Sequence, residues 1–390
     1  MRLAFYTPFV PLNHPKPSGD TAIARSVIDF LRRRGHAVGE TTDFSSEWIW
    51  LRPWTLPGLL RARREFLSHL ETERPDGVLV YHSYYRAPDL LGPLAAARGL
   101  PVFHFGSAYA SRRRKKLLTR PGYELNLKSL RSATHCFTLK RPEYENLRRI
   151  LPDDRATYVR PGIETQRFTP DDDARLLLRV RWNTGADVPI VLTVAMLRSG
   201  TKSEGVAHVI RALGGLHKKG VDFRYLVAGD GPERKALKHL ADEHIPGKAR
   251  FIGRIASVEL PAVYSASDLY AFPGINEGLG MAYLEAQCAG LPAVGWDRWG
   301  AAECIAHGES GFLTPAWDMD AFTDAIRILA TDHAKRVAMG QAARRRVLAE
   351  HDRDRNYVRM ERIMKSYLGA AGPQERYAVP AASAAPETTQ

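Results

Sequence analysis

The sequence predicts an α/β protein with two doubly wound, Rossmann-like domains, and three observations lead to this fold class. A chain of 390 residues is longer than one ordinary hydrophobic core supports and suits two domains of typical size. Short apolar segments typical of buried strands alternate with segments of helical period along most of the chain. Several of the predicted strands lead into glycine-containing loops that open helices, and such sheets bind ligands at the carboxyl ends of their strands.

The composition narrows the class of protein further. Hydrophobic residues make up 44% of the chain and charged residues 25%, which is typical of a soluble globular protein. The cysteines, Cys136, Cys288 and Cys304, include no C-x-x-C pair, which argues against a zinc site or a disulfide framework and indicates a reducing compartment. No apolar run is long enough to span a membrane, and a strand begins almost at once. We therefore expect a cytoplasmic protein.

The first domain is expected over residues 1–170 and begins with a strand, a loop, a helix and a second strand. The loop carries Ser18-Gly19-Asp20, and Gly35-His36 ends the helix that follows it. Because this opening contains no G-x-G-x-x-G pattern, a nicotinamide dinucleotide is a disfavoured ligand. The predicted strands are residues 2–6, 37–38, 77–82, 101–105 and 135–139, and the predicted helices are residues 21–34, 59–73, 88–98, 123–132 and 141–151.

Two histidines of this domain, His82 and His104, fall near the carboxyl ends of predicted strands. That edge of a parallel sheet is where ligands bind, so either histidine is a candidate for a ligand contact. A histidine at a strand end is also often a satisfied structural donor. Both interpretations stay open at this point.

Positive charge is concentrated in the first domain. The net charge is +13, and residues 1–170 hold 28 Lys and Arg against 16 Asp and Glu. The densest part is the run Arg112–Lys116, whose adjacent cations repel one another unless an anionic surface lies opposite. The run is either a solvated loop or a contact for phosphate or an anionic membrane. It has no interleaved aromatic residues, so nucleic acid is not an expected partner.

The boundary between the domains is expected at a proline-rich segment, residues 160–170. The acidic run Asp171–Asp173 follows; its letters fit a metal-binding D-x-D pattern, but its position in a hinge favours solvated acids. The second domain is expected over residues 171–355. A C-terminal helix over residues 356–369 would cross back to the first domain, and residues 370–390, rich in alanine and proline, are predicted to form a disordered tail.

The second domain opens with a β-branched segment, residues 190–194, that predicts a strand. Arg198 and Lys202 follow it on a short loop. Because arginine can bind two phosphate oxygens and lysine acts as a point charge, the pair suits a diphosphate; surface charges at a helix start are the alternative. The other predicted strands are residues 223–228, 251–254, 269–272 and 293–294, and the predicted helices are residues 174–182, 206–217, 233–244, 281–289, 320–329 and 334–350.

The most informative stretch is PGINEGLGMAYLEAQCAGLPAVG, residues 273–295. An apolar strand leads to Glu277 and then to the loop 278–280, which opens a predicted helix carrying Glu285. Such a loop aims free backbone N–H groups and the helix dipole at one point, which makes an anion site. Two ionised acids beside it suit the hydroxyl groups of ribose and hexose. The alternative is that Glu277 caps the helix and Glu285 is a solvated helix residue.

These motifs resemble those of the family-four retaining glycosyltransferases, also called glycosyltransferase group 1, which have the GT-B fold. Glu277 and Glu285, separated by seven residues, match that family's E-x7-E signature. The downstream segments GAAE, at residues 300–303, and HGESGFL, at residues 307–313, are similar to its continuation. Trp299 and Ala302 depart from that pattern, because the family has a glycine and a proline at these two positions.

The resemblance implies a cleft between the two domains and roles for individual residues. In that family, the first acid binds donor-sugar hydroxyls, the second binds ribose hydroxyls, and the basic pair binds the diphosphate. The implied catalytic residues are Glu277, Arg198, Lys202 and His104, and the implied donor-binding residues are Glu285, Gly278, Leu279, Gly280, Arg254 and Gly19.

The predicted activity is transfer of a hexosyl group, with retention at the anomeric carbon, from a nucleotide-diphosphate sugar. The acceptor would be a glycan, a lipid-linked molecule or a small molecule of cell-envelope or polysaccharide biosynthesis, and no metal ion or cofactor is expected. The run Arg112–Lys116 would hold the protein on the inner face of a membrane. A nucleotide-sugar epimerase or hydrolase of the same fold is one alternative. A non-catalytic protein that binds anionic surfaces is the other.

Overall fold

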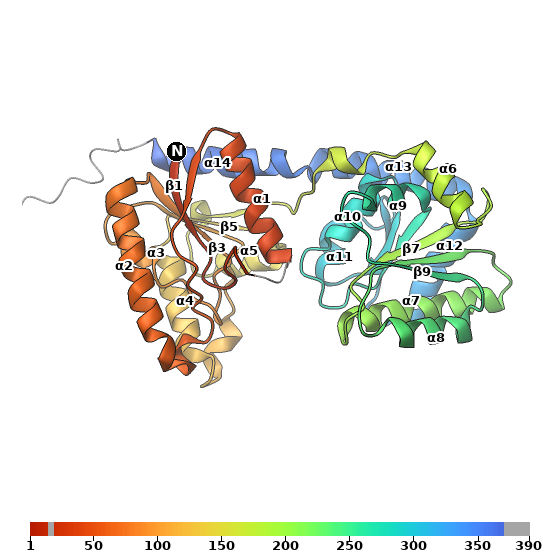
Figure 1. Cartoon of the computed structure of the whole chain (residues 1–390), viewed down its shortest axis with the longest axis horizontal. Helices are drawn as coiled ribbons and strands as arrows, with labels where there is room; N and C mark the ends of the chain where they lie inside the picture. The colour runs from red at the N-terminus through yellow and green to blue at the C-terminus, as the bar shows by residue number, and fades with distance from the viewer. Residues whose placement is uncertain (15–18, 370–390) are drawn as a thin grey trace, which may run out of the picture. The chain divides into compact units, whose positions relative to one another are not determined.

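The structure, a computed structural model, describes residues 1–14 and 19–369 and divides the chain into two compact units (Figure 1). Unit 1 comprises Met1–Val159 together with the chain from Tyr357 onward, and unit 2 comprises Arg160–Asn356. Each unit is built on one six-stranded sheet whose neighbouring strands run parallel. The predicted α/β class with two doubly wound domains is confirmed.

The sheet of unit 1 has the strand order β2-β1-β3-β4-β5-β6. The order reverses between β1 and β3, and open α/β sheets bind ligands beside such a switch point. The last strand, β6, is formed by three residues and was not predicted. The strands are β1 Arg2–Tyr6, β2 Ala37–Glu40, β3 Gly77–Tyr81, β4 Val102–Phe105, β5 His135–Thr138 and β6 Ala156–Tyr158.

Helices cover both faces of this sheet. They are α1 Gly19–Arg33, α2 Leu56–Glu73, α3 Gly92–Ala96, α4 Arg120–Ser132, α5 Arg141–Leu147 and α14 Arg353–Leu368, with the short 3-10 turns η1 Ile49–Leu51, η2 Pro53–Thr55, η3 Ser111–Lys115 and η4 Asp153–Arg155. On one face, Val80 and Val102 share a buried cluster with Phe66 of α2. On the other, the ring of Phe105 lies 5.8 Å from that of Tyr357 of α14, centroid to centroid.

Helix α3 is shorter than the helix predicted over residues 88–98. Asp89 Oδ1 accepts hydrogen bonds from the backbone N atoms of Leu91 and Gly92 at 2.9 and 2.8 Å. This side chain closes a turn, so the chain before Gly92 follows the carboxylate and does not become helical.

Helix α14 is attached to unit 1 by a buried cluster of charges. The Glu361 side chain is 2% exposed and binds His36 Nε2 at 2.8 Å, Arg34 Nε at 3.1 Å and Lys365 Nζ at 2.6 Å. Burial raises the pKa of Glu361, but the hydrogen bonds from Lys365, His36 and Arg34 outweigh it and lower the pKa to about 2. The carboxylate therefore stays ionised and ties α14 to the chain between α1 and β2. The predicted tail, residues 370–390, lies outside the described residues.

The sheet of unit 2 has the strand order β12-β11-β10-β7-β8-β9. Here the order reverses between β7 and β10, so the loops that follow these two strands leave the sheet at its switch point. The strands are β7 Ile190–Val194, β8 Arg224–Ala228, β9 Ala249–Gly253, β10 Leu269–Ala271, β11 Ala293–Trp296 and β12 Gly311–Thr314.

Helices lie on both sides of this sheet as well, with α7 and α8 below it and α9, α10 and α13 above it in the view of Figure 1. The helices of unit 2 are α6 Asp172–Arg181, α7 Thr201–Lys218, α8 Arg234–His244, α9 Leu260–Ala266, α10 Met281–Cys288, α11 Trp299–Cys304, α12 Met319–Thr331 and α13 His333–Glu350, with the 3-10 turn η5 Thr165–Phe168. The sequence did not predict α9 and α11, which are among the shortest.

The proline-rich segment over residues 160–170 packs within unit 2, so the units divide eleven residues before the expected boundary. Ile163 and Phe168 are 4% and 3% exposed and belong to the core of unit 2. The backbone N atom of Ile163 donates to His351 O at 2.9 Å, and that of Arg353 donates to Ile163 O at 3.0 Å. Composition suggested a linker, but these two apolar side chains and the backbone pairing make the segment part of a folded unit.

Candidate functional site

The motif-bearing loops of unit 2 leave two neighbouring strands at the switch point of the sheet. β7 and β10 pair in parallel, with Leu269 opposite Val191. The chain after β7 carries Arg198 and Lys202, and the chain after β10 carries Glu277. Because carboxyl ends of parallel strands share one edge of the sheet, the topology gathers these charges at the edge where ligands bind.

Arg198 is presented by a loop whose backbone is fixed by a glycine turn. Leu197 N donates to Asp230 O, and Glu233 N donates to Leu197 O, both at 3.0 Å. A Cβ atom on Gly231 would lie 2.3 Å from Leu197 O, so only glycine allows this approach. The Arg198 side chain itself is exposed and therefore free to meet an anion.

Lys202 lies in the first turn of α7, not on the loop where the sequence placed it. The helix was predicted to begin at Val206, five residues later. In the structure Gly200, with a φ of 100°, ends the loop and α7 starts directly after it. Packing explains the glycine at position 205, since a Cβ atom there would lie 2.6 Å from the ring of Phe272. Lys202 thus stands on a rigid element.

Lys202 and Glu277 form an ion pair between the Nζ atom and Oε2. The two side chains are 28% and 24% exposed. The Nζ atom also lies 5.5 Å from the centroid of the Phe272 ring, a cation–π distance. The structure therefore joins two residues 75 positions apart in sequence, in a partly open place where a ligand can exchange with the pair.

The loop 278–280 ends at Gly280, which has a φ of 66° and directly precedes α10. A Cβ atom on Gly280 would lie 2.7 Å from Gly300 O, and one on Gly300 would lie 2.6 Å from Gly280 N, so the two backbones touch. In the described part of the chain no group accepts a hydrogen bond from the backbone N–H groups of residues 278–280. These donors and the start of α10 favour a bound anion.

Trp299 has a backbone conformation that glycine adopts more readily than a bulky residue. Its φ is 52°, in the left-handed region that a bulky residue adopts only with strain. The next residue is Gly300, so the strained turn delivers the glycine that touches the loop 278–280.

Glu285 lies in the second turn of α10 in a half-buried position. The Oη atom of Tyr264 donates a hydrogen bond to Glu285 Oε2 at 2.8 Å. Burial raises the pKa of Glu285 to about 7, against the lowering effects of the Tyr264 hydrogen bond and of nearby Arg167. The carboxyl group therefore changes charge near neutral pH, and a ligand that donates hydrogen bonds to it favours the ionised form.

His104 is fully enclosed in unit 1, with a side chain that is 0% exposed. Its Nδ1 atom lies 3.0 Å from Ser107 Oγ, and its Nε2 atom lies 3.3 Å from both Asp89 Oδ2 and Ser129 Oγ. Each ring nitrogen is thus engaged by buried partners. This placement supports the structural interpretation, and a contact of His104 with a donor sugar stays a prediction.

Two further residues that were predicted to contact the donor are not among the residues gathered at the switch point of the unit 2 sheet. Arg254 is exposed directly after β9, and Gly19 is the first residue of α1 in unit 1. Their roles toward a donor stay predictions. Sequence reasoning missed Tyr264, because it lies in the unpredicted α9. It also noted Gly300 only as part of a motif, although a second glycine is the signal for a close backbone contact with Gly280.

Taken with their topology, the two units place the chain in the GT-B-like class of folds. Solved structures agree with this: HepE of Anabaena, in complex with UDP, superposes with a TM-score of 0.73 at 17% identity, covering 94% of this chain and 100% of that chain. Sucrose-phosphate synthase from Thermosynechococcus elongatus has a TM-score of 0.69 at 20% identity, covering 95% and 99%. At these identities the likeness concerns the fold alone.

A family match is found within unit 2. Residues 178–346, less than half of the chain, match the family model described as glycosyl transferases group 1. The match contains the Arg198, Lys202, Glu277 and Glu285 positions.

Curated relatives cover shorter parts of the chain. A GDP-mannose-dependent alpha-(1-6)-phosphatidylinositol monomannoside mannosyltransferase of Mycolicibacterium smegmatis is 34% identical over 201 residues, which are 50% of this chain and 52% of the relative. A D-inositol 3-phosphate glycosyltransferase of Pseudarthrobacter chlorophenolicus is 25% identical over 74% of this chain and 71% of its own length. The chain thus spans about half the length of the first of these relatives.

Proposed function

We propose that this protein is a glycosyltransferase that moves a hexosyl group, with retention at the anomeric carbon, from a nucleotide-diphosphate sugar bound to unit 2. One observation carries the proposal: Lys202, Glu277 and the free N–H groups of residues 278–280 all lie at the switch point of the unit 2 sheet. The match of residues 178–346 to the family model of glycosyl transferases group 1 supports the reaction type. The donor that the mannosyltransferase relative's name specifies, GDP-mannose, supports the donor class.

In the proposed reaction the bond between the anomeric carbon and the β-phosphate oxygen breaks, and its electrons stay on the diphosphate. An acceptor hydroxyl oxygen forms the new bond on the same face, and its proton passes to the leaving phosphate. Arg198, Lys202 and the N–H groups of residues 278–280 stabilise the charge that develops on the diphosphate. Glu277 accepts hydrogen bonds from the donor sugar, and Glu285 accepts them from the ribose. This site holds the diphosphate without a metal ion.

The ion pair gives Glu277 a second effect on the donor. A diphosphate must compete with this carboxylate for Lys202. Glu277→Gln keeps the size of the side chain but removes its charge, so we expect a nucleoside diphosphate to bind on the order of tenfold more tightly. Turnover falls in the same variant, because the sugar hydroxyls lose their charged acceptor.

The direct test is nucleotide release from UDP-glucose, GDP-mannose and ADP-glucose, with and without a lipid extract as a source of acceptor. We expect one donor to be used, release to rise with the extract, and the new glycosidic bond to keep the donor's anomeric configuration by NMR. Lys202→Gln should lower turnover by about 100-fold or more, because the diphosphate leaving group loses the positive charge that stabilises it. Lys235→Gln, an exposed lysine on α8, is the matched control and should leave turnover unchanged.

Two other outcomes would favour the alternatives. Release that does not respond to any acceptor, or inversion of a stereocentre in the sugar, would identify a hydrolase or an epimerase of the same fold. Absence of both turnover and nucleotide binding would favour the non-catalytic surface-binding protein.

We also propose that unit 1 attaches the protein to an anionic membrane surface. Four of the five side chains of Arg112–Lys116 are exposed, and Leu117 and Leu118 after them are 88% and 58% exposed. Exposed apolar side chains beside cations are typical of proteins that lie on a bilayer. No helix of the described residues is long and apolar enough to cross a membrane. The name of the mannosyltransferase relative contains a lipid, phosphatidylinositol monomannoside, which supports a membrane-bound acceptor.

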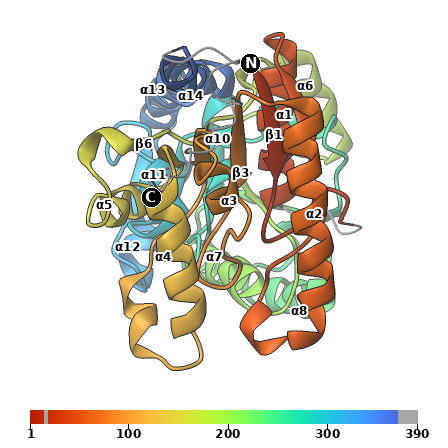
Figure 2. The same ribbon diagram turned by 90° about the vertical axis from the view of Figure 1, so that its left-hand side faces the viewer.

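A second exposed apolar segment adjoins the first. Trp50 Nε1 donates to Leu118 O at 2.9 Å, which joins the chain from η1 to the start of α2 with the basic run. The first turns of α2 and α4 lie at the same lower end of unit 1 in Figures 1 and 2. The exposed apolar side chains of this segment are Leu51, Trp54, Leu56 and Leu60, at 44%, 73%, 49% and 63%.

Flotation with liposomes tests the attachment. We expect recovery with anionic vesicles and little with neutral ones, and loss of recovery in both Arg114→Glu/Lys115→Glu and Leu117→Ser/Leu118→Ser. Lys235→Glu/Lys238→Glu makes the same charge change on exposed α8 and should float like the wild type. Equal recovery on both vesicle types would overturn the proposal.

A further inference from the structure

Helix α6 of unit 2 turns two arginines toward the rest of the unit and three apolar side chains toward solvent. Leu176, Leu177 and Val180 are 68%, 70% and 71% exposed. The helix lies at the edge of unit 2 in Figure 1. An amphipathic helix on a protein surface ordinarily packs its apolar stripe on the core. The reversed arrangement therefore serves something other than the folding of unit 2.

The two arginines fasten α6 to the unit. Arg175 Nη2 lies 2.6 Å from Asp268 Oδ1, and Arg179 Nη1 lies 2.9 Å from Asp268 Oδ2. Arg179 is 5% exposed and also donates to the carbonyl oxygens of Gly185 and Val188, each at 2.6 Å. Because Asp268 directly precedes β10, these bonds tie the helix to the sheet at two residues one turn apart. The exposed apolar face is thus a fixed feature of the folded unit.

The outward side chains of α6 form one stripe with opposite charges at its two ends. The stripe consists, in order, of Asp173, Leu176, Leu177, Val180 and Arg181. These positions, i, i+3, i+4, i+7 and i+8, share one face of a helix, and all five side chains are exposed. Within the described part of the chain, the side chains of Asp173 and Arg181 have no hydrogen-bond or ion-pair partner. An exposed apolar stripe with polar ends is typical of an interaction surface.

The stripe is complementary to itself. Asp173 and Arg181 are each four residues from Leu177, which is about 6 Å along a helix axis. When two copies of α6 pack antiparallel about a twofold axis at Leu177, Asp173 of each copy lies opposite Arg181 of the partner subunit. The apolar side chains of both copies then meet between the two charged pairs. A parallel arrangement would place like charges together, so the charges favour the antiparallel one.

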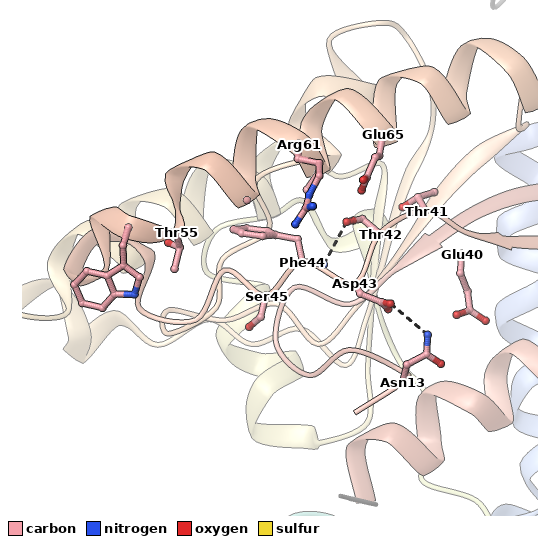
Figure 3. Close-up of a pocket in the computed structure, with 13 residues that line it drawn as sticks. Asn13, Glu40, Thr41, Thr42, Asp43, Phe44, Ser45, Thr55, Arg61 and Glu65 are labelled. Carbon is pink, nitrogen blue, oxygen red and sulfur yellow. Dashed lines mark hydrogen bonds between the residues drawn. The ribbon is translucent and has the colours of Figure 1, made fainter. Parts of the chain in front are cut away.

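A second mode of self-association would place the stripe in a pocket elsewhere on another copy, which builds open chains. Unit 1 has an open pocket of about 800 Å³ between the chain that leaves β2 and the first turns of α2 (Figure 3). The ionisable side chains of its lining are those of Glu40, Asp43, Glu65 and Arg61. Leucine and valine side chains would remove water from these charged groups without replacing its hydrogen bonds. The pocket therefore disfavours the stripe, and pairing of α6 with itself is the better match.

An anionic membrane is also a poorer match for this face. Asp171, Asp172 and Asp173 are all exposed at one end of the stripe. Asp171 Oδ1 accepts a hydrogen bond from Ala174 N at 2.9 Å, which fixes these acids at the start of α6. The negative potential of such a membrane repels carboxylates. A second copy of the chain supplies apolar surface and cations together.

We propose that α6 of one copy packs antiparallel on α6 of a second copy, about a twofold axis at Leu177, and so forms a homodimer. A helix of ten residues offers less contact area than a standard protein interface. The dimer is therefore weak, with an expected dissociation constant of about 10–100 µM. The proposal is independent of the reaction proposed for unit 2.

Analytical ultracentrifugation of the full chain without lipid, from about 2 to 500 µM, tests the dimer. We expect the average mass to rise from one chain toward two chains and to stop there. Leu177→Glu puts two like charges at the twofold axis and should leave a monomer at every concentration. Trp54→Ser is the control, because it removes another exposed apolar side chain, from the lining of the unit 1 pocket, and should dimerise like the wild type.

Exchange of the charges at the ends of the stripe tests the antiparallel register. Asp173→Arg makes both ends of the stripe positive, and Arg181→Asp makes both ends negative. Each variant alone should dimerise at least about tenfold more weakly than the wild type, because like charges face each other. An equimolar mixture of the two variants should recover the wild-type affinity, because every acid then faces a cation. A folding defect would not be repaired by mixing.

Several results would overturn the proposal. These are a monomer up to about 500 µM, an average mass that rises beyond two chains, dimerisation that survives Leu177→Glu, and a mixture that stays as weak as its components. A monomeric protein whose flotation with vesicles falls in Leu177→Glu would assign the face to a membrane instead. Circular dichroism of each variant shows that it is folded.

Discussion

At the scale of single residues, Glu285 carries the sharpest dependence on conditions. Burial raises its pKa to about 7, so the carboxyl group is largely protonated at pH 6 and ionised at pH 8. Ribose hydroxyls donate to the ionised form. We therefore expect nucleotide affinity to rise up to about tenfold between pH 6 and pH 8, measured by isothermal titration calorimetry. Glu285→Gln should show only the pH dependence of the nucleotide itself; an unchanged profile in this variant would contradict the ribose role.

The same residue affects stability with the opposite sign. Between pH 4.5 and pH 7 the folded state holds a proton on Glu285 that the unfolded state has released, so the free energy of unfolding contributed by this group falls as pH rises through that window. Nucleotide binding, which needs the ionised form, increases over the upper part of the same range. The two trends separate a binding role from a structural one.

The sequence motifs indicated which residues are candidates for the site, but not which side chains surround each candidate. Glu277 and Lys202 were found from their pattern, but that they pair with each other depends on the neighbouring positions of β7 and β10. His104 has the right place in sequence for a ligand contact. Its side chain instead completes a buried network with Asp89 and Ser107, and this depends on which face of β4 it occupies.

At the scale of elements, the contact between Gly280 and Gly300 holds the anion loop in place. Gly300→Ala would put a Cβ atom 2.6 Å from Gly280 N, and backbone cannot give way as a flexible side chain can. We expect the loop 278–280 to shift and nucleoside diphosphate affinity to fall by about tenfold or more, since misplaced donors lose their hydrogen bonds. Ala302→Ser, at an exposed position of the same helix α11, is the control and should bind as the wild type does. Unchanged affinity in Gly300→Ala would show that the contact does not position the loop.

The order of most strands and helices could be predicted because hydrophobic periodicity survives in a single sequence. Element ends depended on contacts that a sequence does not display. α7 begins five residues earlier than predicted, because Gly205 packs on Phe272 and does not break the helix. α3 is short because the Asp89 carboxylate closes a turn ahead of it. The strands β6 and β12 and the helices α9 and α11, which were not predicted, are too short to show a period.

At the scale of the whole molecule, two separate segments of the chain form unit 1, and Glu361 binds the second segment to the first. Its lowered pKa means that this carboxylate stabilises the folded state above pH 4.5, and that the contribution is lost as pH falls toward about 2. Glu361→Gln should lower the free energy of unfolding of unit 1 by about 3 kcal/mol at neutral pH, because buried charged hydrogen bonds are lost.

Hydrogen exchange of the α14 amides during denaturant titration measures this change within unit 1. The difference between Glu361→Gln and the wild type should shrink as pH is lowered from about 4.5 toward 2. Asp29→Asn, an exposed acid on α1, should have little effect at any pH. A pH-independent difference would mean that packing, not the ionised carboxylate, fastens α14.

The central claim is that the switch point of the unit 2 sheet binds the diphosphate of a nucleotide-sugar donor. Thermal unfolding of the full chain with UDP, GDP and ADP, for the wild type, Lys202→Gln and Lys235→Gln, tests it most directly. A ligand that binds only the folded state raises the unfolding temperature. We predict a rise with one of the nucleotides in the wild type and in Lys235→Gln, and its loss in Lys202→Gln. No rise with any nucleotide, or an equal rise in Lys202→Gln, would contradict the account.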